Sequence, residues 1–196
     1  MQAERLITSD GVAMQGPLLL TPQVFGDERG FFFESWNSRR WSELLEQDGR
    51  QVMPFVQDNH SRSARGVLRG LHLQIAPQPQ AKLVRCVLGE IFDVAVDLRG
   101  GSPSFGQWVG ARLSASNHQQ LWVPEGFAHG FLTLSEHAEV LYKTSDFWNR
   151  DCERSLRWDD PSLAIEWPLE GLQVQLSGKD GEAPLWDEAP VDQWFQ

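Results

Sequence analysis

The stretch Gly66-Val-Leu-Arg-Gly-Leu-His-Leu-Gln74 decides the fold, because it sets three polar side chains into an otherwise apolar, β-prone run. These side chains belong to Arg69, His72 and Gln74. Strict alternation along a strand sends Arg69 and His72 to opposite faces. Gly70 lies between them, and a glycine inside a strand often marks a bulge that re-aims side chains. The sequence therefore predicts a bulged strand whose Arg69 and His72 face one cavity.

Outward from this stretch, the chain from residue 51 onward has the pattern of short strands separated by turns. The turn signals are Ser61-Arg-Ser-Ala64, Pro77-Gln-Pro79, Gly89-Glu90, Gly100-Gly-Ser-Pro103 and Pro124-Glu-Gly126. Regular short strands of this kind are typical of an antiparallel barrel or jelly roll. We expect a mainly β fold with one or a few short helices, in a single domain that spans residues 1–196.

The N-terminal part predicts a hairpin followed by a helix. A strand at 18–25 turns through the tight loop 26–30 into Phe31-Phe-Phe-Glu34. Asn37 or Ser38 can then cap a helix that ends at Gly49. Its apolar residues share one face, so we expect it to serve packing: Trp41, Leu44 and Leu45.

A second hairpin is predicted where Gly89-Glu90 separates the apolar segments 82–88 and 91–98. Asp93 and Asp97 alternate with apolar residues on the second segment, and a simple register would place them opposite Lys82 or Arg85. A solvated outer face and a cavity face are both compatible with these two carboxylates.

Composition excludes several classes of function. The formal charge of −10 disfavours nucleic acid and anionic membranes as partners. A signal-like N-terminus and an apolar run of membrane-spanning length are both missing from the pattern, which favours a cytoplasmic protein. Cys86 in a strand and Cys152 in a polar loop offer neither a disulfide framework nor metal-ligand spacing, so both are expected to be free thiols.

Two motifs with the spacing of cupin proteins surround the opening stretch. The first consists of Gly66, His72, Gln74, Lys82 and Gly89, and the second contains the Pro-x-Gly-x-x-His core at Pro124-Glu-Gly-Phe-Ala-His129. Thr133 stands where an asparagine usually follows. Metal cupins bind their ion with three histidines and a glutamate. Here Gln74 replaces a histidine and Lys82 replaces the glutamate, and a lysine repels a divalent ion. We expect a cupin cavity without a metal or another cofactor.

At greater length the chain resembles the dTDP-4-dehydrorhamnose 3,5-epimerase family, whose members are metal-free cupins. The resemblance runs from about residue 26 to residue 179 and rests on Gln57-Asp-Asn-His-Ser61, Gly66-Val-Leu-Arg-Gly-Leu-His72, Lys82-Leu-Val-Arg85, Phe92-Asp-Val-Ala-Val-Asp97, Leu121-Trp-Val-Pro-Glu-Gly-Phe-Ala-His-Gly-Phe131 and Tyr142-Lys143. It implies epimerisation of dTDP-4-dehydro-6-deoxy-D-glucose at carbons 3 and 5 in dTDP-rhamnose biosynthesis. It also implies a homodimer that exchanges N-terminal strands.

This reaction requires a base, a group that stabilises an enolate, and an acid on the opposite face of the sugar. His72 suits the base, because an unperturbed imidazole titrates near ~6.5. The resemblance places Asp180 against it, where a carboxylate fixes the tautomer. Lys82 suits the enolate oxygen and Tyr142 suits the acid.

The resemblance also implies the substrate contacts. Arg29 and Arg69 are expected at the diphosphate, because a guanidinium pairs bidentately with phosphate oxygens. Glu34, Gln57 and Asn59 are expected at the nucleoside. The remaining expected contacts are Lys82, Lys179, His129 and Trp148, the last at a stacking position where a tyrosine is usual in the family.

Two alternatives from other functional classes remain open from the residues. A metal-dependent cupin oxygenase or isomerase would use His72 and His129 as ligands. A binding module for nucleotide sugars would keep the arginines without needing His72, Asp180 and Tyr142. Closer rivals are an epimerase that acts at one carbon and a ketoisomerase.

Overall fold

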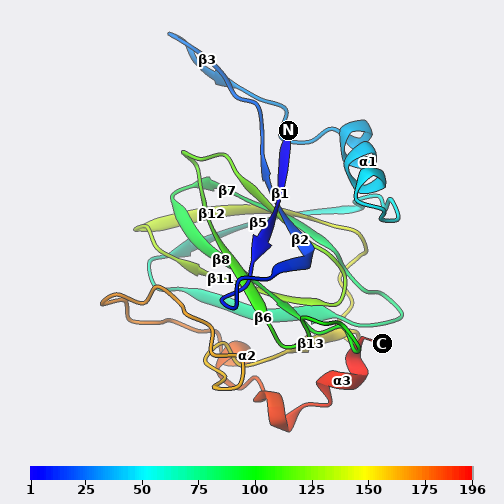
Figure 1. Ribbon diagram of the computed structural model, residues 1–196. Helices are drawn as coiled ribbons and strands as arrows, with labels where there is room; N and C mark the ends of the chain where they lie inside the picture. The colour runs from blue at the N-terminus through cyan, green and yellow to red at the C-terminus, as the bar shows by residue number, and fades with distance from the viewer. Residues whose placement is uncertain (196) are drawn as a thin grey trace.

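Two antiparallel sheets face each other in the computed structural model, which describes residues 1–195 (Figure 1). The larger sheet has the order β1-β2-β10-β7-β12-β5, with β1 Gln2–Ile7, β2 Ala13–Thr21, β10 Gln120–Val123, β7 Lys82–Leu88, β12 His137–Thr144 and β5 Gln57–Ala64. The smaller sheet has the order β13-β6-β11-β8-β9, with β13 Glu153–Ser155, β6 Leu68–Gln74, β11 Phe127–Thr133, β8 Glu90–Asp97 and β9 Trp108–Ser114. The mainly β jelly roll predicted from the sequence is confirmed.

The inner faces of the two sheets form the central core. Val84 of β7 packs there with Ile91 of β8 and Phe127 of β11. Successive residues of a strand point to opposite faces, so residues two positions away point inward too. Lys82 and His129 occupy such positions, and this is how polar side chains come to lie inside the barrel.

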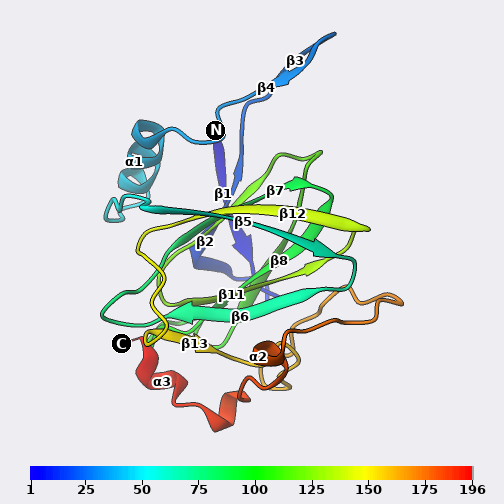
Figure 2. The ribbon, with the colours of Figure 1, turned by 180° about the vertical axis from the view of Figure 1, so that it is seen from behind.

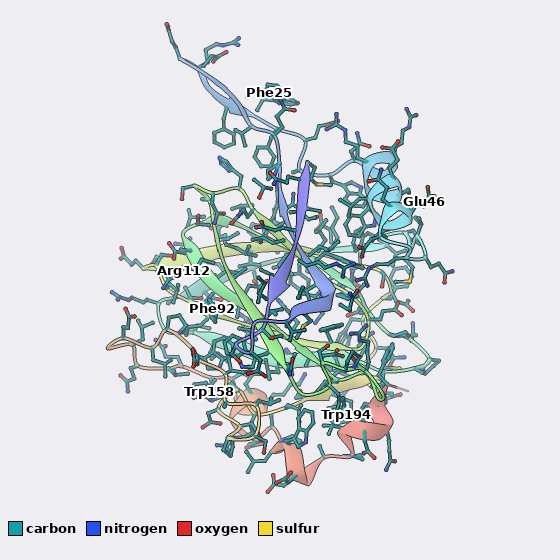
Figure 3. The ribbon with its side chains drawn as sticks, in the orientation of Figure 1. Phe25, Glu46, Phe92, Arg112, Trp158 and Trp194 are labelled. Atoms are coloured by element: carbon teal, nitrogen blue, oxygen red, sulfur yellow. The ribbon has the colours of Figure 1, made fainter. Side chains whose placement is uncertain are left out.

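Each sheet is covered on its outer face by a different part of the chain. The helix α1 Ser38–Gln47 buries Trp41 and Leu45 against Leu18 and Trp122 of the larger sheet. Asn37 caps this helix and Gly49 follows it with a φ of +72°, as the sequence predicts. The segment after β13 covers the smaller sheet and carries α2 Gly178–Gly181, the 3-10 helix η1 Trp186–Glu188 and α3 Val191–Trp194. Figure 3 shows this segment, with Trp158 and Trp194, at the opposite end of the molecule from the N-terminal hairpin.

The N-terminal hairpin is present, but the strand that precedes it differs from the prediction. β2 spans Ala13–Thr21 instead of 18–25, and the hairpin is built from β3 Phe25–Asp27 and β4 Gly30–Phe32. It projects away from the barrel in both views (Figures 1 and 2). Its side chains Phe25, Phe31 and Phe32 are 57%, 64% and 67% exposed.

The predicted hairpin of 82–88 with 91–98 is wrong. β7 pairs with β10 and β12, whereas β8 pairs with β9 and β11 of the other sheet. Gly89, with a φ of +75°, carries the chain from one sheet to the other, and a Cβ there would lie 2.1 Å from the carbonyl oxygen of His137. Asp93 and Asp97 therefore do not meet Lys82 or Arg85 across a hairpin. Both carboxylates are fully buried, which also excludes the solvated outer face.

The turn predicted at 61–64 is wrong as well, because these residues continue β5 to Ala64. Serine is compatible with a strand whose inner face lines a polar cavity. Ser63 is buried on that face while Arg62 is exposed on the other. The chain turns one step later, at Arg65 and Gly66.

Cys86 and Cys152 are both buried free thiols, as predicted, although the segment around Cys152 is less exposed than its polar sequence suggests. Among the helices of residues 1–195, none is long and apolar enough to cross a membrane.

Candidate active site

The bulge at Gly70 brings Arg69 and His72 to the same cavity. His72 pairs with His129 of β11, whereas Arg69 pairs with Phe131. Between these two pairs β6 advances three residues and β11 advances two, which defines a β-bulge. Gly70 has a φ of +123°, and a Cβ on it would lie 2.5 Å from the Cα of Gly130. Only glycine fits this close approach of the two strands. The predicted bulge and the shared cavity are confirmed.

The cavity has a volume of about 510 Å³ and lies between the sheets, bordered by the segment that precedes α2. Its walls combine polar groups from both sheets with apolar side chains. The lining residues are Ser61, Val67, Leu68, Arg69, His72, Lys82, His129, Phe131, Tyr142, Gln175, Leu176, Ser177 and Asp180. Five of the predicted site residues are thereby joined with Asp180 in one place.

His72 and Asp180 form a hydrogen-bonded pair although 108 positions separate them in the sequence. His72 Nε2 lies 2.6 Å from Asp180 Oδ1, and Ser177 Oγ donates to Asp180 Oδ2 at 2.8 Å. Burial raises the pKa of the Asp180 carboxyl, but the hydrogen bonds from His72 and Ser177 outweigh it and lower the pKa below its ordinary value. The ionised carboxylate therefore holds Nε2 and leaves Nδ1 as the nitrogen available for proton transfer.

Lys82 is a buried cation in the wall of the same cavity. Its Nζ donates to the carbonyl oxygen of His72 at 3.2 Å, and the residue is 8% exposed. Burial lowers the pKa of Lys82 to about 8, while the negative charges of Glu153 and Asp93 oppose this shift and Lys179 adds to it. Lys82 can therefore be charged at neutral pH and still lose its proton in mild alkali.

Tyr142 approaches the cavity from the larger sheet, whereas His72 lies on the smaller one. Burial raises the pKa of the Tyr142 phenol, and the charge of Glu153 acts in the same direction, while Arg69 lowers it. The phenol thus keeps its proton at neutral pH. The base and acid candidates come from facing walls, as inversion of a carbon requires.

The expected binding residues at the mouth of the cavity are held by neighbours. Arg69 donates from Nε to Ser63 Oγ at 3.0 Å. Gln57 donates to Asn59 Oδ1 at 2.9 Å and accepts from the backbone N–H of Trp148 at 3.2 Å. Trp148 itself is 57% exposed. Both Gln57 and Asn59 lie on the same face of β5 as the cavity residue Ser61, so the structure groups them on one side of the mouth.

Arg29 and Glu34 do not reach this cavity within one chain. Arg29 lies at the tip of the projecting hairpin and pairs with Asp27. Glu34 pairs with Arg40 at 2.7 Å and lines a separate hollow beside α1. These two expected nucleotide contacts are thus separated from His72.

The positions that bind metal in other cupins have other partners here. His72 and His129 each use Nε2 to contact a carboxylate, Asp180 and Asp93 respectively. Gln74 joins two loops: it donates to the carbonyl oxygen of Gln78, just after β6, and to that of Phe147 in the loop 146–149, where it also accepts from the N–H of Asn149. Position 82 supplies a cation in place of a carboxylate ligand, and residues 1–195 contain no group of three or more histidine, cysteine, aspartate or glutamate side chains that could hold a metal ion.

Two charged residues at the site, Glu153 and Asp93, are not among the site residues predicted from the sequence. Glu153 of β13 forms an ion pair of 2.6 Å with Lys179 and acts on the charge of Lys82. Asp93 contacts His129 at 2.7 Å. Glu153 lies in a polar segment without periodicity, so no local signal marks it. The alternation in 91–98 did flag Asp93, without placing it.

Comparison with known proteins shows which family the chain belongs to. A family model described as dTDP-4-dehydrorhamnose 3,5-epimerase matches residues 11–188. Proteins named dTDP-4-dehydrorhamnose 3,5-epimerase from Pseudomonas aeruginosa and Salmonella typhimurium are each 58% identical to the chain; the alignments cover 96% and 90% of it, and 98% and 94% of those proteins.

A solved structure is similar over the whole length. The crystal structure of dTDP-6-deoxy-D-glucose-3,5-epimerase from Legionella pneumophila, in complex with dTDP-4-keto-L-rhamnose, is 47% identical. It superposes with a TM-score of 0.88 and covers 100% of this chain and 98% of its own. With the family model and the relatives in agreement, the chain belongs to the dTDP-4-dehydrorhamnose 3,5-epimerase family.

Proposed function

We propose that this chain epimerises dTDP-4-dehydro-6-deoxy-D-glucose at carbons 3 and 5 and yields dTDP-4-dehydro-L-rhamnose, with residues 1–196 acting as one catalytic domain. The observation that carries the proposal is the facing arrangement in one cavity of the His72–Asp180 pair and the Tyr142 phenol, with Lys82 in the same wall. The family membership supports the choice of substrate.

The proposed chemistry follows from these groups. His72 removes the proton from a carbon next to the ketone, and the electron pair of that C–H bond becomes the enolate. The charge of Lys82 stabilises the enolate oxygen, because a fixed cation in a dry cavity interacts far more strongly than in water. Tyr142 then donates a proton from the opposite face, which inverts the carbon. Solvent restores the proton of Tyr142 and removes the one held by His72.

The proposal predicts the product and its labelling. Incubation with dTDP-4-dehydro-6-deoxy-D-glucose in heavy water that contains a chelator should give dTDP-4-dehydro-L-rhamnose with deuterium at carbons 3 and 5, read by proton NMR. Inversion at one carbon would identify a single-site epimerase, and binding without inversion would identify a binding module. Activity that vanishes on chelation and returns with one divalent ion would overturn the metal-free mechanism.

We also propose a homodimer in which the β3–β4 hairpin reaches the partner's cavity. Arg29 lies in the turn between β3 and β4 and is not among the residues that line the cavity of its own chain. The hairpin projects from the barrel (Figure 1) and exposes three phenylalanines that a second copy could cover. The free thiols of Cys86 and Cys152 fit a reducing compartment and support the cytoplasm as its place of work.

Mixing two inactive variants tests this exchange. Arg29→Ala and His72→Ala chains should each be impaired alone, but a heterodimer of the two contains one intact site. Unfolding and refolding the mixture should therefore restore about a quarter of the wild-type activity. No recovery, or a monomer by light scattering with full activity, would show that each chain works alone.

A further inference from the structure

Strand β8 carries two fully buried carboxylates, Asp93 and Asp97, on the same inward-facing side. Both carboxylate oxygens of Asp97 accept hydrogen bonds. It accepts from the backbone N–H and the guanidinium of Arg99, and from the hydroxyl groups of Ser102 and Ser104, the last two at 2.6 Å each. These hydrogen bonds lower the pKa of Asp97 although burial acts in the opposite direction. Asp97 therefore has a structural role: it holds the loop that follows β8 through Arg99, Ser102 and Ser104.

Asp93 is placed differently. Its Oδ1 lies 2.7 Å from His129 Nε2, and within residues 1–195 its Oδ2 has no hydrogen-bond partner. A buried carboxylate with one partner for two oxygens is costly for folding, and an apolar residue would pack there at lower cost. This unfavourable arrangement lies directly behind the cavity wall, which points to a role in the reaction instead of in stability.

The strand register connects Asp93 to the groups in the cavity. Asp93 pairs with Phe131 of β11, His129 lies two residues away on the same face, and His129 pairs with His72 of β6. His129 is 8% exposed and lines the cavity. Because Asp93 engages Nε2, the Nδ1 atom of His129 is the one left for a bound molecule.

Lys82 is the second cavity group on which the charge of Asp93 acts. The groups around it are Glu153 of β13, Asp93 of β8, His72 of β6, His129 of β11, Tyr142 of β12 and Lys179 of α2. The negative charges of Glu153 and Asp93 raise the pKa of Lys82 against the effect of burial. Glu153 also pairs with Lys179, whereas the described contacts of Asp93 include no cation other than His129 when that ring is protonated.

We propose that Asp93 is a positioning residue for the reaction: it fixes the His129 ring toward the bound sugar and supplies a negative charge that acts on Lys82. It does not touch substrate itself, since it is fully buried behind His129. The proposal rests on the proposed epimerase activity for its kinetic test, so a second test uses the free protein.

The test compares Asp93→Asn with Asp97→Asn, which removes an equally buried charge from the same strand. Asp93→Asn keeps the shape and an acceptor for His129 but removes the charge. We expect kcat to fall by about ten- to a hundred-fold, as happens when the carboxylate that orients a metal-binding histidine is removed. The alkaline limb of kcat/KM should also move to lower pH, because Lys82 loses its proton more readily. Asp97→Asn should lower the melting temperature and leave this limb in place.

The free protein gives a readout that does not need activity. The NMR titration of the Lys82 side chain should move to lower pH in Asp93→Asn and stay unchanged in Asp97→Asn. The neutral His129 ring of the wild type should carry its proton on Nε2, which nitrogen shifts report even when a variant fails to fold. A proton on Nδ1, or a Lys82 titration and kcat that are unaltered in folded Asp93→Asn, would overturn the proposal. An inactive wild type with the expected titrations would instead count against the proposed function.

Discussion

Replacing Tyr142 by phenylalanine is expected to separate proton exchange from inversion. The variant keeps the ring in the wall of the cavity and loses the transferable proton. His72 can still remove a substrate proton and return one to the same face, so deuterium from heavy water should continue to enter the substrate. Inverted product should fall by about a hundred- to ten-thousand-fold, the usual contribution of general acid catalysis. Mass spectrometry and proton NMR of the same samples measure the two quantities.

The matched variant is His72→Ala, which removes the base and should abolish exchange and inversion together. Trp148→Phe is a second control, because Trp148 is exposed outside the cavity and takes no part in proton transfer. It should retain the wild-type ratio of exchange to inversion. Equal losses of exchange and inversion in Tyr142→Phe would assign Tyr142 a packing role and leave the acid to another group.

Replacing Lys82 by methionine is expected to impair catalysis and stabilise the fold at the same time. Loss of a preorganised group for the enolate oxygen should lower kcat by about a hundred- to a thousand-fold. The folded-state pKa of about 8 lies below the ordinary value of 10.5, so the folded chain holds this proton less tightly than the unfolded chain. The stability cost of the buried charge is thus fully present below pH 8 and disappears as pH rises toward 10.5.

Two measurements check this prediction. At neutral pH the melting temperature of Lys82→Met should exceed that of the wild type, and the difference should shrink in alkali. The wild-type kcat/KM should decline above a pH of about 8. Lys143→Met is the control, because Lys143 pairs with Asp58 outside the cavity and should change neither quantity much. A melting temperature that falls in Lys82→Met would mean that the ammonium group is a structural contact.

The sequence predicted the parts of the fold and site that have a local cause. Asn37 and Gly49 limit α1 because a cap and a left-handed residue act within one turn of the helix. Gly70 predicted the bulge because only a glycine permits that approach of β6 to Gly130. The cupin spacing likewise places His72, Lys82 and His129 on strands that line one cavity.

The remaining features depend on contacts between distant parts of the chain. A glycine with positive φ is compatible both with a tight hairpin and with a crossing between sheets. The presence of Gly89 therefore did not predict that β7 and β8 lie in different sheets. Asp180 meets His72 from 108 positions away, in a segment that has the composition of a surface turn. The family resemblance supplied that pairing, and nothing in the pattern of residues would have done so.

The placement of Gln74 limits how this barrel could be redesigned. Histidine at position 74 and glutamate at position 82 would restore the three histidines and one glutamate that bind the ion in metal cupins. The chain would then lose the amide that joins strand β6 to the carbonyl oxygens of Gln78 and Phe147 and to the N–H of Asn149. The loop that presents Trp148 would lose two of its hydrogen bonds in the same step. An engineer who wants a metalloenzyme on this scaffold must therefore rebuild the rim of the barrel before changing its centre.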